Sequence, residues 1–207
     1  MNIVAVSGPK GAGKDTLIKA LIKKAEQDFP AGFVERAIIT TDRIPRLDEI
    51  PGQDIESVSR EQFDELTARQ EILFPKTISG AIEYRNGVRP SELNKAAVVI
   101  LNIVGSYVPQ LKELTEKTNG KVYGIFLHTG KVQRAERIGR REELLFPEMI
   151  SSTVEADPGR IDVRSLKNFD SFIENREGFF ERTAEQAYRE LKPFLQSIFK
   201  PQASHGT

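Results

Sequence analysis

A glycine-rich segment close to the start of the chain has the residue types that bind a phosphate. It runs, in order, Gly8, Pro9, Lys10, Gly11, Ala12, Gly13, Lys14, Asp15 and Thr16. An apolar run, 3–6, precedes it and a helix-like run, 17–22, follows it, which is the strand–turn–helix context of a P-loop. Glycines let successive backbone N–H groups point inward, where they and the helix N-terminus hold an anion. We therefore expect these nine residues to bind ATP, with Lys14 reaching its β- and γ-phosphates.

The segment departs from the usual P-loop at the residue after the lysine. A Ser or Thr whose hydroxyl helps to hold Mg²⁺ usually stands there, whereas in this chain Asp15 follows Lys14 and Thr16 comes one residue later. We expect Asp15 to lie beside the magnesium, either as a ligand or through a bound water. The alternative is a glycine-rich turn that holds no ligand, but the spacing, the lysine and the flanking elements all favour a nucleotide site.

Two arginines could hold a second phosphate. Arg43 and Arg46 stand three residues apart in a polar loop, 40–52, and Pro45 stiffens the chain between them. A guanidinium keeps its charge and offers paired donors to a phosphate. The loop follows the second predicted strand, at the sheet edge where the P-loop also lies, and an acceptor phosphate must stand in line with the transferred phosphoryl group. The alternative is a solvated loop with ordinary exposed arginines.

A basic segment farther along the chain could cover the site. Arginines stand at positions 134, 137, 140 and 141, and Arg137 and Arg141 share one helix face. Cations closing over the transferred group would stabilise the charge of the transition state and exclude water. The alternative is a solvated helix whose arginines pair with neighbouring glutamates, which is common and contributes little.

The elements that must position these groups alternate between strand and helix. Strands are predicted at 3–6, 33–39, 98–104, 121–127 and 171–174, and helices at 17–22, 59–69, from about 91, 106–117, 131–140 and 183–199. Such alternation predicts a parallel sheet covered on both faces. We expect an α/β fold of the P-loop NTPase type: a three-layer sandwich around a parallel central sheet, with an acceptor-binding subdomain and a lid.

Local signals mark some of the boundaries. Capping boxes are predicted at 59–62 and 183–186, each with a hydroxyl residue followed three positions later by Gln. Asn86-Gly87 is a strong turn signal between short strand pieces. Residues 141–167 show no clean periodicity, and we expect them to be mobile.

Composition restricts the class of protein. The chain of 207 residues has 30 basic and 30 acidic residues, no cysteine and two histidines. Balanced charge argues against a dedicated nucleic-acid binder, and the cysteine and histidine counts leave no thiolate or histidine metal site. No apolar run approaches the roughly 20 residues of a membrane span. No basic region precedes the first apolar stretch, so we expect no signal peptide and a cytoplasmic location.

The chain resembles the guanylate kinases over most of its length. Residues 7–17 are similar to the family's P-loop, and Arg43-Ile44-Pro45-Arg46 resembles its arginine–x–proline–arginine loop, which grips the phosphate of a nucleoside monophosphate. Residues 52–54 and 58–63 are similar to its glycine–x–aspartate and valine–serine–arginine–glutamate segments. Residues 170–175 resemble a stretch whose final asparagine, here Asn175, lies beside the ATP base. The spacing of Arg137 and Arg141 resembles that of the family's lid arginines.

The departures from the family concern the acceptor. Ile55 stands where the family has a tyrosine that contacts the acceptor phosphate, and the acids that read guanine have no clear counterparts. Glu83 and Tyr84 could replace those contacts. Asn102 stands at about the place of an aspartate near the metal and the base, and an amide cannot supply its negative charge. These changes leave open whether the acceptor is guanine-containing.

The resemblance implies an enzyme that transfers the γ-phosphoryl group of Mg·ATP to GMP, dGMP or a similar monophosphate. The alternatives are another P-loop small-molecule kinase, of the ribose 1,5-bisphosphate phosphokinase or deoxynucleotide kinase type, and a non-catalytic binding domain. We expect a monomer or homodimer that binds neither nucleic acid nor membranes. One domain would span 1–200, with a core (1–40, 91–135, 168–199), an acceptor-binding region (41–90) and a lid (136–167), before a disordered tail (201–207).

Overall fold

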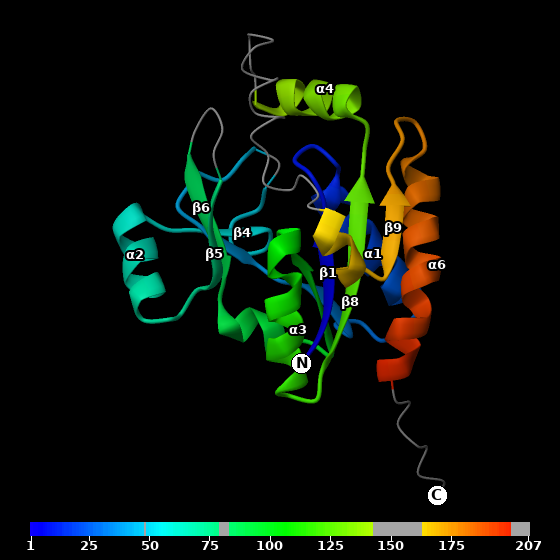
Figure 1. The fold of residues 1–207 in the computed structure, drawn as a ribbon, viewed down its shortest axis with the longest axis horizontal. Coiled ribbons are helices and arrows are strands. Elements are labelled where there is room, and N and C mark those ends of the chain that lie inside the picture. Colours follow the sequence, from blue (N-terminus) through cyan, green and yellow to red (C-terminus); the bar gives the residue numbers. More distant parts are fainter. Residues whose placement is uncertain (48, 79–82, 143–162, 200–207) are drawn as a thin grey trace, which may run out of the picture.

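A parallel five-stranded sheet forms the centre of the molecule, with the strand order β2-β7-β1-β8-β9. Figure 1 shows three of these strands, β1, β8 and β9, side by side. The computed structural model describes residues 1–47, 49–78, 83–142 and 163–199. The strands are β1 (Asn2–Ser7), β2 (Val34–Arg36), β7 (Val98–Asn102), β8 (Lys121–His128) and β9 (Ser171–Glu174). From β1 the chain crosses to β2 on one side, and β7 and β8 flank β1 on opposite sides. The carboxyl ends of β1 and β7 therefore meet where the strand order changes direction, which is where ligands bind in such sheets.

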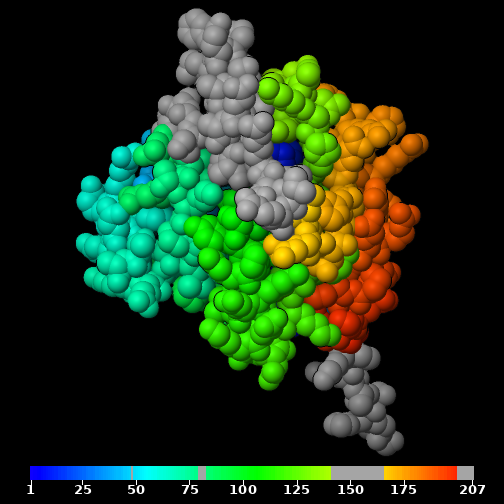
Figure 2. All heavy atoms as spheres, in the orientation of Figure 1, coloured from blue at the N-terminus to red at the C-terminus, as the bar shows by residue number. Residues whose placement is uncertain are grey.

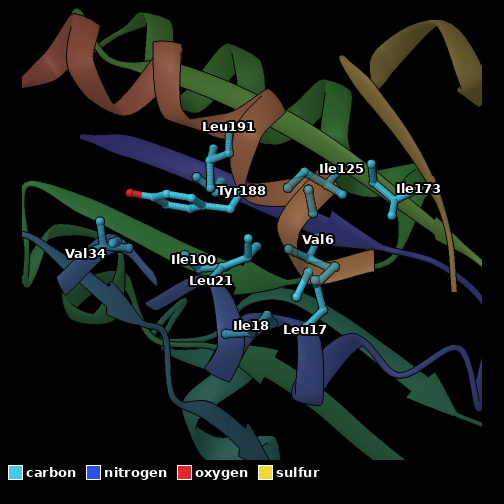
Figure 3. Packing of buried hydrophobic residues seen from close by; sticks show 14 of the residues in the cluster. Val6, Leu17, Ile18, Leu21, Val34, Ile100, Ile125, Ile173, Tyr188 and Leu191 are labelled. Atoms are coloured by element: carbon cyan, nitrogen blue, oxygen red, sulfur yellow. The ribbon is translucent and has the colours of Figure 1, made fainter. Parts of the chain in front are cut away.

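Helices cover both faces of this sheet, as predicted for a three-layer sandwich. The helices α1 (Lys14–Asp28) and α6 (Phe180–Ile198) pack on one face, where Leu17, Leu21 and Leu191 are fully buried (Figure 3). The helix α3 (Val108–Glu116) packs on the other face. Apolar residues run almost without interruption along β1 and β7, because a parallel strand in the middle of three layers meets apolar neighbours on both sides.

A second, smaller sheet stands beside the central one, with the order β4-β3-β6-β5. Its strands are β3 (Ile39–Thr41), β4 (Ile55–Ser57), β5 (Leu73–Ile78) and β6 (Tyr84–Val88). The prediction of one strand over 33–39 is therefore wrong, because the chain leaves the central sheet after Arg36. The Ile38 amide donates to Glu92 Oε2 at 2.8 Å, and Ile39 then pairs with Val88 in the smaller sheet.

Of the two predicted capping boxes, one is present. Ser59 accepts from the Gln62 amide and the Gln62 side chain accepts from the Ser59 amide, which starts α2 (Arg60–Ala68). The box at 183–186 is wrong, since α6 already begins at Phe180. The Thr183 hydroxyl lies 3.3 Å from the Glu174 carbonyl oxygen and 3.2 Å from that of Phe179.

The predicted turn at Asn86-Gly87 is also wrong, because both residues lie within β6. The glycine serves a close approach between strands instead. A Cβ at Gly87 would stand 2.2 Å from Ile72 Cγ2 and 3.1 Å from the Leu73 carbonyl oxygen. Ile72 is 4% exposed, so its side chain has little room to move.

We expect Gly87→Ala to lower the free energy of unfolding by roughly 1–3 kcal/mol, because the methyl group overfills this contact. Urea unfolding followed by circular dichroism measures the change. Gly130→Ala is the matched control, since the nearest atom to a Cβ added there is Gln133 Oε1, at 3.8 Å. An equal unfolding midpoint for the two variants would contradict this reading of the contact.

The remaining elements connect these layers. The helix expected near residue 91 is the short 3₁₀ helix η1 (Pro90–Asn94), and η2 (Gly105–Tyr107) leads into α3. The basic helix α4 (Lys131–Glu142) is present, and η3 (Val163–Asn168) precedes β9. Most of the segment expected to be mobile lies outside the described residues, as does the predicted tail. Within the described ranges, no helix has the length and apolar character to cross a membrane.

Candidate active site

The loop between β1 and α1 has the backbone of an anion site. Gly8, Gly11 and Gly13 have positive φ angles of 146°, 80° and 93°. Gly13 also caps α1, and a Cβ there would stand 2.7 Å from Asn175 Nδ2. The P-loop therefore needs glycine at this position for its backbone conformation and for the packing behind it.

Lys14 lies over the loop that carries it. Its Nζ donates to the carbonyl oxygens of Gly8 at 2.8 Å and Pro9 at 3.0 Å. The ammonium group thus stands at the mouth of the loop, at the first residue of α1. That position lets the loop amides and the lysine act on the same phosphate.

Asn175 holds the P-loop from behind. Its Nδ2 donates to the Ala12 carbonyl oxygen at 2.7 Å, and its own backbone carbonyl accepts from the Thr129 hydroxyl at 2.9 Å. The residue is 3% exposed. The resemblance implies a contact between Asn175 and the ATP base, which remains a prediction. The hydrogen bond from Asn175 to the Ala12 carbonyl oxygen holds the P-loop in its conformation.

The two arginines of the second predicted phosphate site share one carboxylate. Arg43 donates to both oxygens of Glu49, at 2.8 and 2.5 Å, and Arg46 donates to Glu49 Oε1 at 3.2 Å. Burial disfavours the charge on Glu49, but bonds from both arginines outweigh it and lower the pKa of Glu49 to about 2. Glu49 is therefore ionised at neutral pH, and it orients two cations while neutralising one.

One cavity of about 350 Å³ joins the P-loop to this pair of arginines. The predicted site residues that line it are Gly8, Lys10, Gly11, Gly13, Lys14, Asp15, Thr16, Arg43, Arg46, Tyr84, Asn102 and Arg137. Pro9, Ala12, Glu83 and Asn175 are not among the described residues of its lining. Figure 2 shows the blue of the first residues at the bottom of a hollow beside α4.

Glu83 lies outside the described lining of the cavity, so its contact with an acceptor base stays a prediction. Its side chain is exposed, and its carbonyl oxygen accepts from Arg60. Tyr84, the other predicted residue of this pair, faces the cavity, and the Arg43 guanidinium lies 5.4 Å from the centre of its ring. The tyrosine thus supports the arginine by a cation–π contact.

The basic helix α4 lies against the P-loop. Arg137 Nη1 is 3.4 Å from the Gly11 carbonyl oxygen and 3.5 Å from that of Ala12. Arg134, which the sequence placed in the cluster but not in the site, donates to the Lys10 carbonyl oxygen at 2.9 Å. The side chain of Arg141 lies outside the described part of the structure, so its role stays a prediction.

Asp15 is held by two neighbours at the floor of the cavity. Its Oδ1 accepts from Arg36 at 2.7 Å and from Asn102 at 3.3 Å. Within the described ranges, no three His, Cys, Asp or Glu residues cluster as a metal site. A Mg²⁺ ion there would take one carboxylate, Asp15, and complete its shell with waters and phosphate oxygens, which is the usual arrangement for this ion.

Sequence reasoning missed Arg36, Glu49, Asp54 and Lys76, all of which line the cavity. Arg36 joins Asp15 to Asp54. Because it lies in the middle of the predicted strand 33–39, no local signal marked it as a residue of the site. The three-residue spacing from Arg46 was the signal for Glu49.

Lys76 and Asn86 stand opposite each other in β5 and β6, which puts both side chains on the face that Tyr84 shares.

The charge balance of the cavity fits two phosphorylated ligands. Its described lining contains seven Lys and Arg residues and three carboxylates. Each carboxylate, on Asp15, Glu49 or Asp54, accepts from at least one arginine of the same lining. Among the described lining residues, Lys and Arg therefore outnumber Asp and Glu by four.

Comparison with known proteins decides the family. The family model for guanylate kinase matches residues 1–197. The chain belongs to the guanylate kinase family. A guanylate kinase of Schizosaccharomyces pombe is 28% identical over 212 residues, covering 94% of this chain and 90% of that one. A guanylate kinase of Chlamydia pneumoniae is 36% identical over 108 residues, or 50% of each chain.

A solved structure has the same fold as this guanylate kinase family member. The guanylate kinase of Anaplasma phagocytophilum superposes with a TM-score of 0.59 at 17% identity, covering 97% of this chain and 87% of that one. The chain spans about half the length of the curated Chlamydia relatives that it matches. Family and fold are thus established, and the P-loop NTPase prediction is confirmed.

Proposed function

We propose that this chain is an ATP-dependent nucleoside monophosphate kinase, a phosphotransferase that moves the γ-phosphoryl group of ATP to the phosphate of GMP, dGMP or a similar acceptor. The observation that carries the proposal is the single cavity with the P-loop on one side and the Arg43–Arg46 pair on the other. The names of the relatives support the same reaction class.

The residues divide the work by charge. The P-loop amides and Lys14 bind the donor phosphates, and Arg43 and Arg46 bind the acceptor phosphate. Arg137 reaches the P-loop from α4 and stabilises the charge of the transferred group, with Arg141 as a second lid cation. An acceptor oxygen attacks the γ-phosphorus, the bond to the β-phosphate oxygen breaks, and ADP leaves. Asp15 would hold Mg²⁺, directly or through a water, and the ion would supply neutralisation of phosphate charge.

A second candidate is a kinase for a different phosphorylated acceptor, such as a sugar bisphosphate or another nucleotide. The wall of the cavity beyond Tyr84 carries Lys76 and Asn86. The carboxylates of the described lining, on Asp15, Glu49 and Asp54, lie elsewhere and each pairs with an arginine. Guanine presents N–H donors on its base-pairing edge, and a lysine cannot accept from them. Asn86 supplies one amide oxygen that can accept such a bond, and Lys76 beside it donates, so this wall also suits a group with acceptor oxygens.

A screen of acceptors with Mg·ATP tests the proposal and separates the candidates. ADP formation is measured with GMP, dGMP, CMP, UMP, dTMP, ribose 5-phosphate and ribose 1,5-bisphosphate. We expect at least one of these acceptors to give saturable ADP release above the rate with ATP alone. Turnover with ribose 1,5-bisphosphate or a pyrimidine nucleotide but not with GMP and dGMP would favour the second candidate.

The proposed kinase function is wrong if none of these acceptors raises the rate of ADP release. Calorimetric titration with Mg·ATP then distinguishes a nucleotide-binding protein from a binding domain without a nucleotide site. A cytoplasmic location, as expected from the sequence, would supply both nucleotides.

A further inference from the structure

We propose that Arg36 is a positioning residue that joins the donor half of the site to the acceptor half. This inference rests on the proposed function for its acceptor part and on nucleotide binding alone for its donor part. The residue ends β2, at the sheet edge where the P-loop lies, and its side chain is 13% exposed. No family motif quoted above contains it.

The guanidinium bridges two carboxylates from distant parts of the chain. One nitrogen donates to Asp15 Oδ1 at 2.7 Å and the other to Asp54 Oδ1 at 2.8 Å. Asp15 belongs to the P-loop, and Asp54 directly precedes β4 of the second sheet. A planar guanidinium can serve both carboxylates at once, which the ammonium group of a lysine does less well.

On the donor side, Arg36 compensates for the aspartate at the end of the P-loop. A negative side chain beside the phosphates of ATP would repel them, and solvent screens that repulsion only in part, because the Asp15 side chain is 46% exposed. The bonds from Arg36 and Asn102 both end on Oδ1 of Asp15, and within the described residues no donor is assigned to Oδ2. Arg36 therefore cancels the charge and orients the carboxylate, with Oδ2 available to the cavity.

On the acceptor side, Arg36 anchors the loop that carries the phosphate clamp. Burial disfavours the charge of Asp54, but bonds from the Ile50 amide and Lys19, with the charge of Arg36, lower the pKa of Asp54. The Ile50 amide donates to Asp54 Oδ2 at 3.1 Å. Ile50 follows Glu49, the residue that holds Arg43 and Arg46. A contiguous chain of bonds thus runs from the P-loop through Arg36 to the acceptor clamp.

Lys19 separates the two roles, because it contacts only one of the carboxylates. Its Nζ donates to Asp54 Oδ2 at 3.1 Å, and its side chain is 54% exposed. Removing Lys19 weakens the hold on Asp54 and leaves the Asp15–Arg36 pair in place. Lys19→Met is therefore a matched control in which the acceptor side alone changes.

The experiment measures ATP affinity by calorimetry and acceptor KM by steady-state kinetics in four proteins: wild type, Arg36→Met, Lys19→Met and the double variant Asp15→Ser/Arg36→Met. We expect Arg36→Met to weaken Mg·ATP binding about tenfold and to raise the acceptor KM. The double variant should regain ATP affinity to within about threefold of wild type, because the charge that needed compensation is gone. Its acceptor KM should stay raised, since Asp54 is still without Arg36.

Two results would overturn the inference. One is wild-type ATP affinity in Arg36→Met, and the other is a double variant that binds ATP as poorly as Arg36→Met. If Arg36→Met does not fold, Arg36→Lys serves instead, with the loss of ATP affinity smaller and the rise in acceptor KM retained. If wild type binds ATP but transfers to no acceptor, the proposed function fails while the rescue of ATP affinity still tests the donor side.

Discussion

Replacing Lys14 with methionine should lower kcat by about 10³-fold, the upper part of the range for removing one donor that stabilises transition-state charge. The ammonium group stands over the P-loop carbonyls, where the terminal phosphates of ATP would lie. Methionine keeps the aliphatic stem and removes the charge, so the helix start is preserved. The variant is tested by ADP release with the best acceptor at saturating Mg·ATP.

A lysine on the same helix provides the control for this variant. Lys24 lies on α1 and pairs with Glu185 on α6 at 2.5 Å, away from the cavity lining. Lys24→Met removes the same charge from the same element and should keep wild-type kcat. Equal activity of Lys14→Met and wild type would remove Lys14 from the donor site, provided that both variants unfold at similar temperatures.

The second large effect is expected at the acceptor clamp. Arg43→Met should raise the acceptor KM roughly 30- to 150-fold, which corresponds to the loss of about 2–3 kcal/mol in charged hydrogen bonds. The KM for ATP should change little, because the P-loop stands on the other side of the cavity. Both constants come from the same steady-state assay with each substrate varied in turn.

Arg89 provides the control for Arg43. It lies in the loop that follows β6, and its guanidinium pairs with Glu56 at 2.7 Å outside the cavity lining. Arg89→Met removes an arginine from Glu56, as Arg43→Met removes one from Glu49, but Arg89 does not line the cavity. A similar rise in acceptor KM for both variants would show that the effect on KM reflects loss of structure and not loss of a phosphate contact.

The P-loop could be predicted from sequence because its chemistry is local. The glycines, the lysine and the flanking apolar runs all lie within about 20 residues, and the backbone conformation follows from them. The buried strand β7 was equally clear, since an unbroken apolar run indicates a strand covered on both faces. The fold class follows from the alternation of such elements.

Elements that depend on distant partners were predicted less well. Residues 33–39 look like one strand, but Val34 pairs with Val98 in one sheet and Ile39 pairs with Val88 in another. Nothing in the local pattern marks that change of partner. Asn86-Gly87 has the residue types of a turn, but the close contact of Gly87 with Ile72 and Leu73 exists only in three dimensions.

The same limit explains the residues of the site that sequence reasoning missed. Arg36 joins Asp15 and Asp54, which are 39 positions apart in the sequence, and its bonds exist only because β2 ends beside the P-loop. Glu49 is closer to its partners, but a carboxylate near two arginines in a polar loop has many possible arrangements. Side-chain bridges of this kind are decided by tertiary structure and not by spacing.

The claim that one cavity holds donor and acceptor phosphates together is tested most directly by a bisubstrate analogue, in which adenosine is joined through five phosphates to the nucleoside of the nucleotide acceptor that turns over fastest. Calorimetry should give one site per chain, with binding more than about tenfold tighter than that of ATP alone, because the second half binds at high effective concentration. Lys14→Met and Arg43→Met should each abolish that gain. An analogue that binds no more tightly than ATP, with an affinity unchanged in Arg43→Met, would contradict the account.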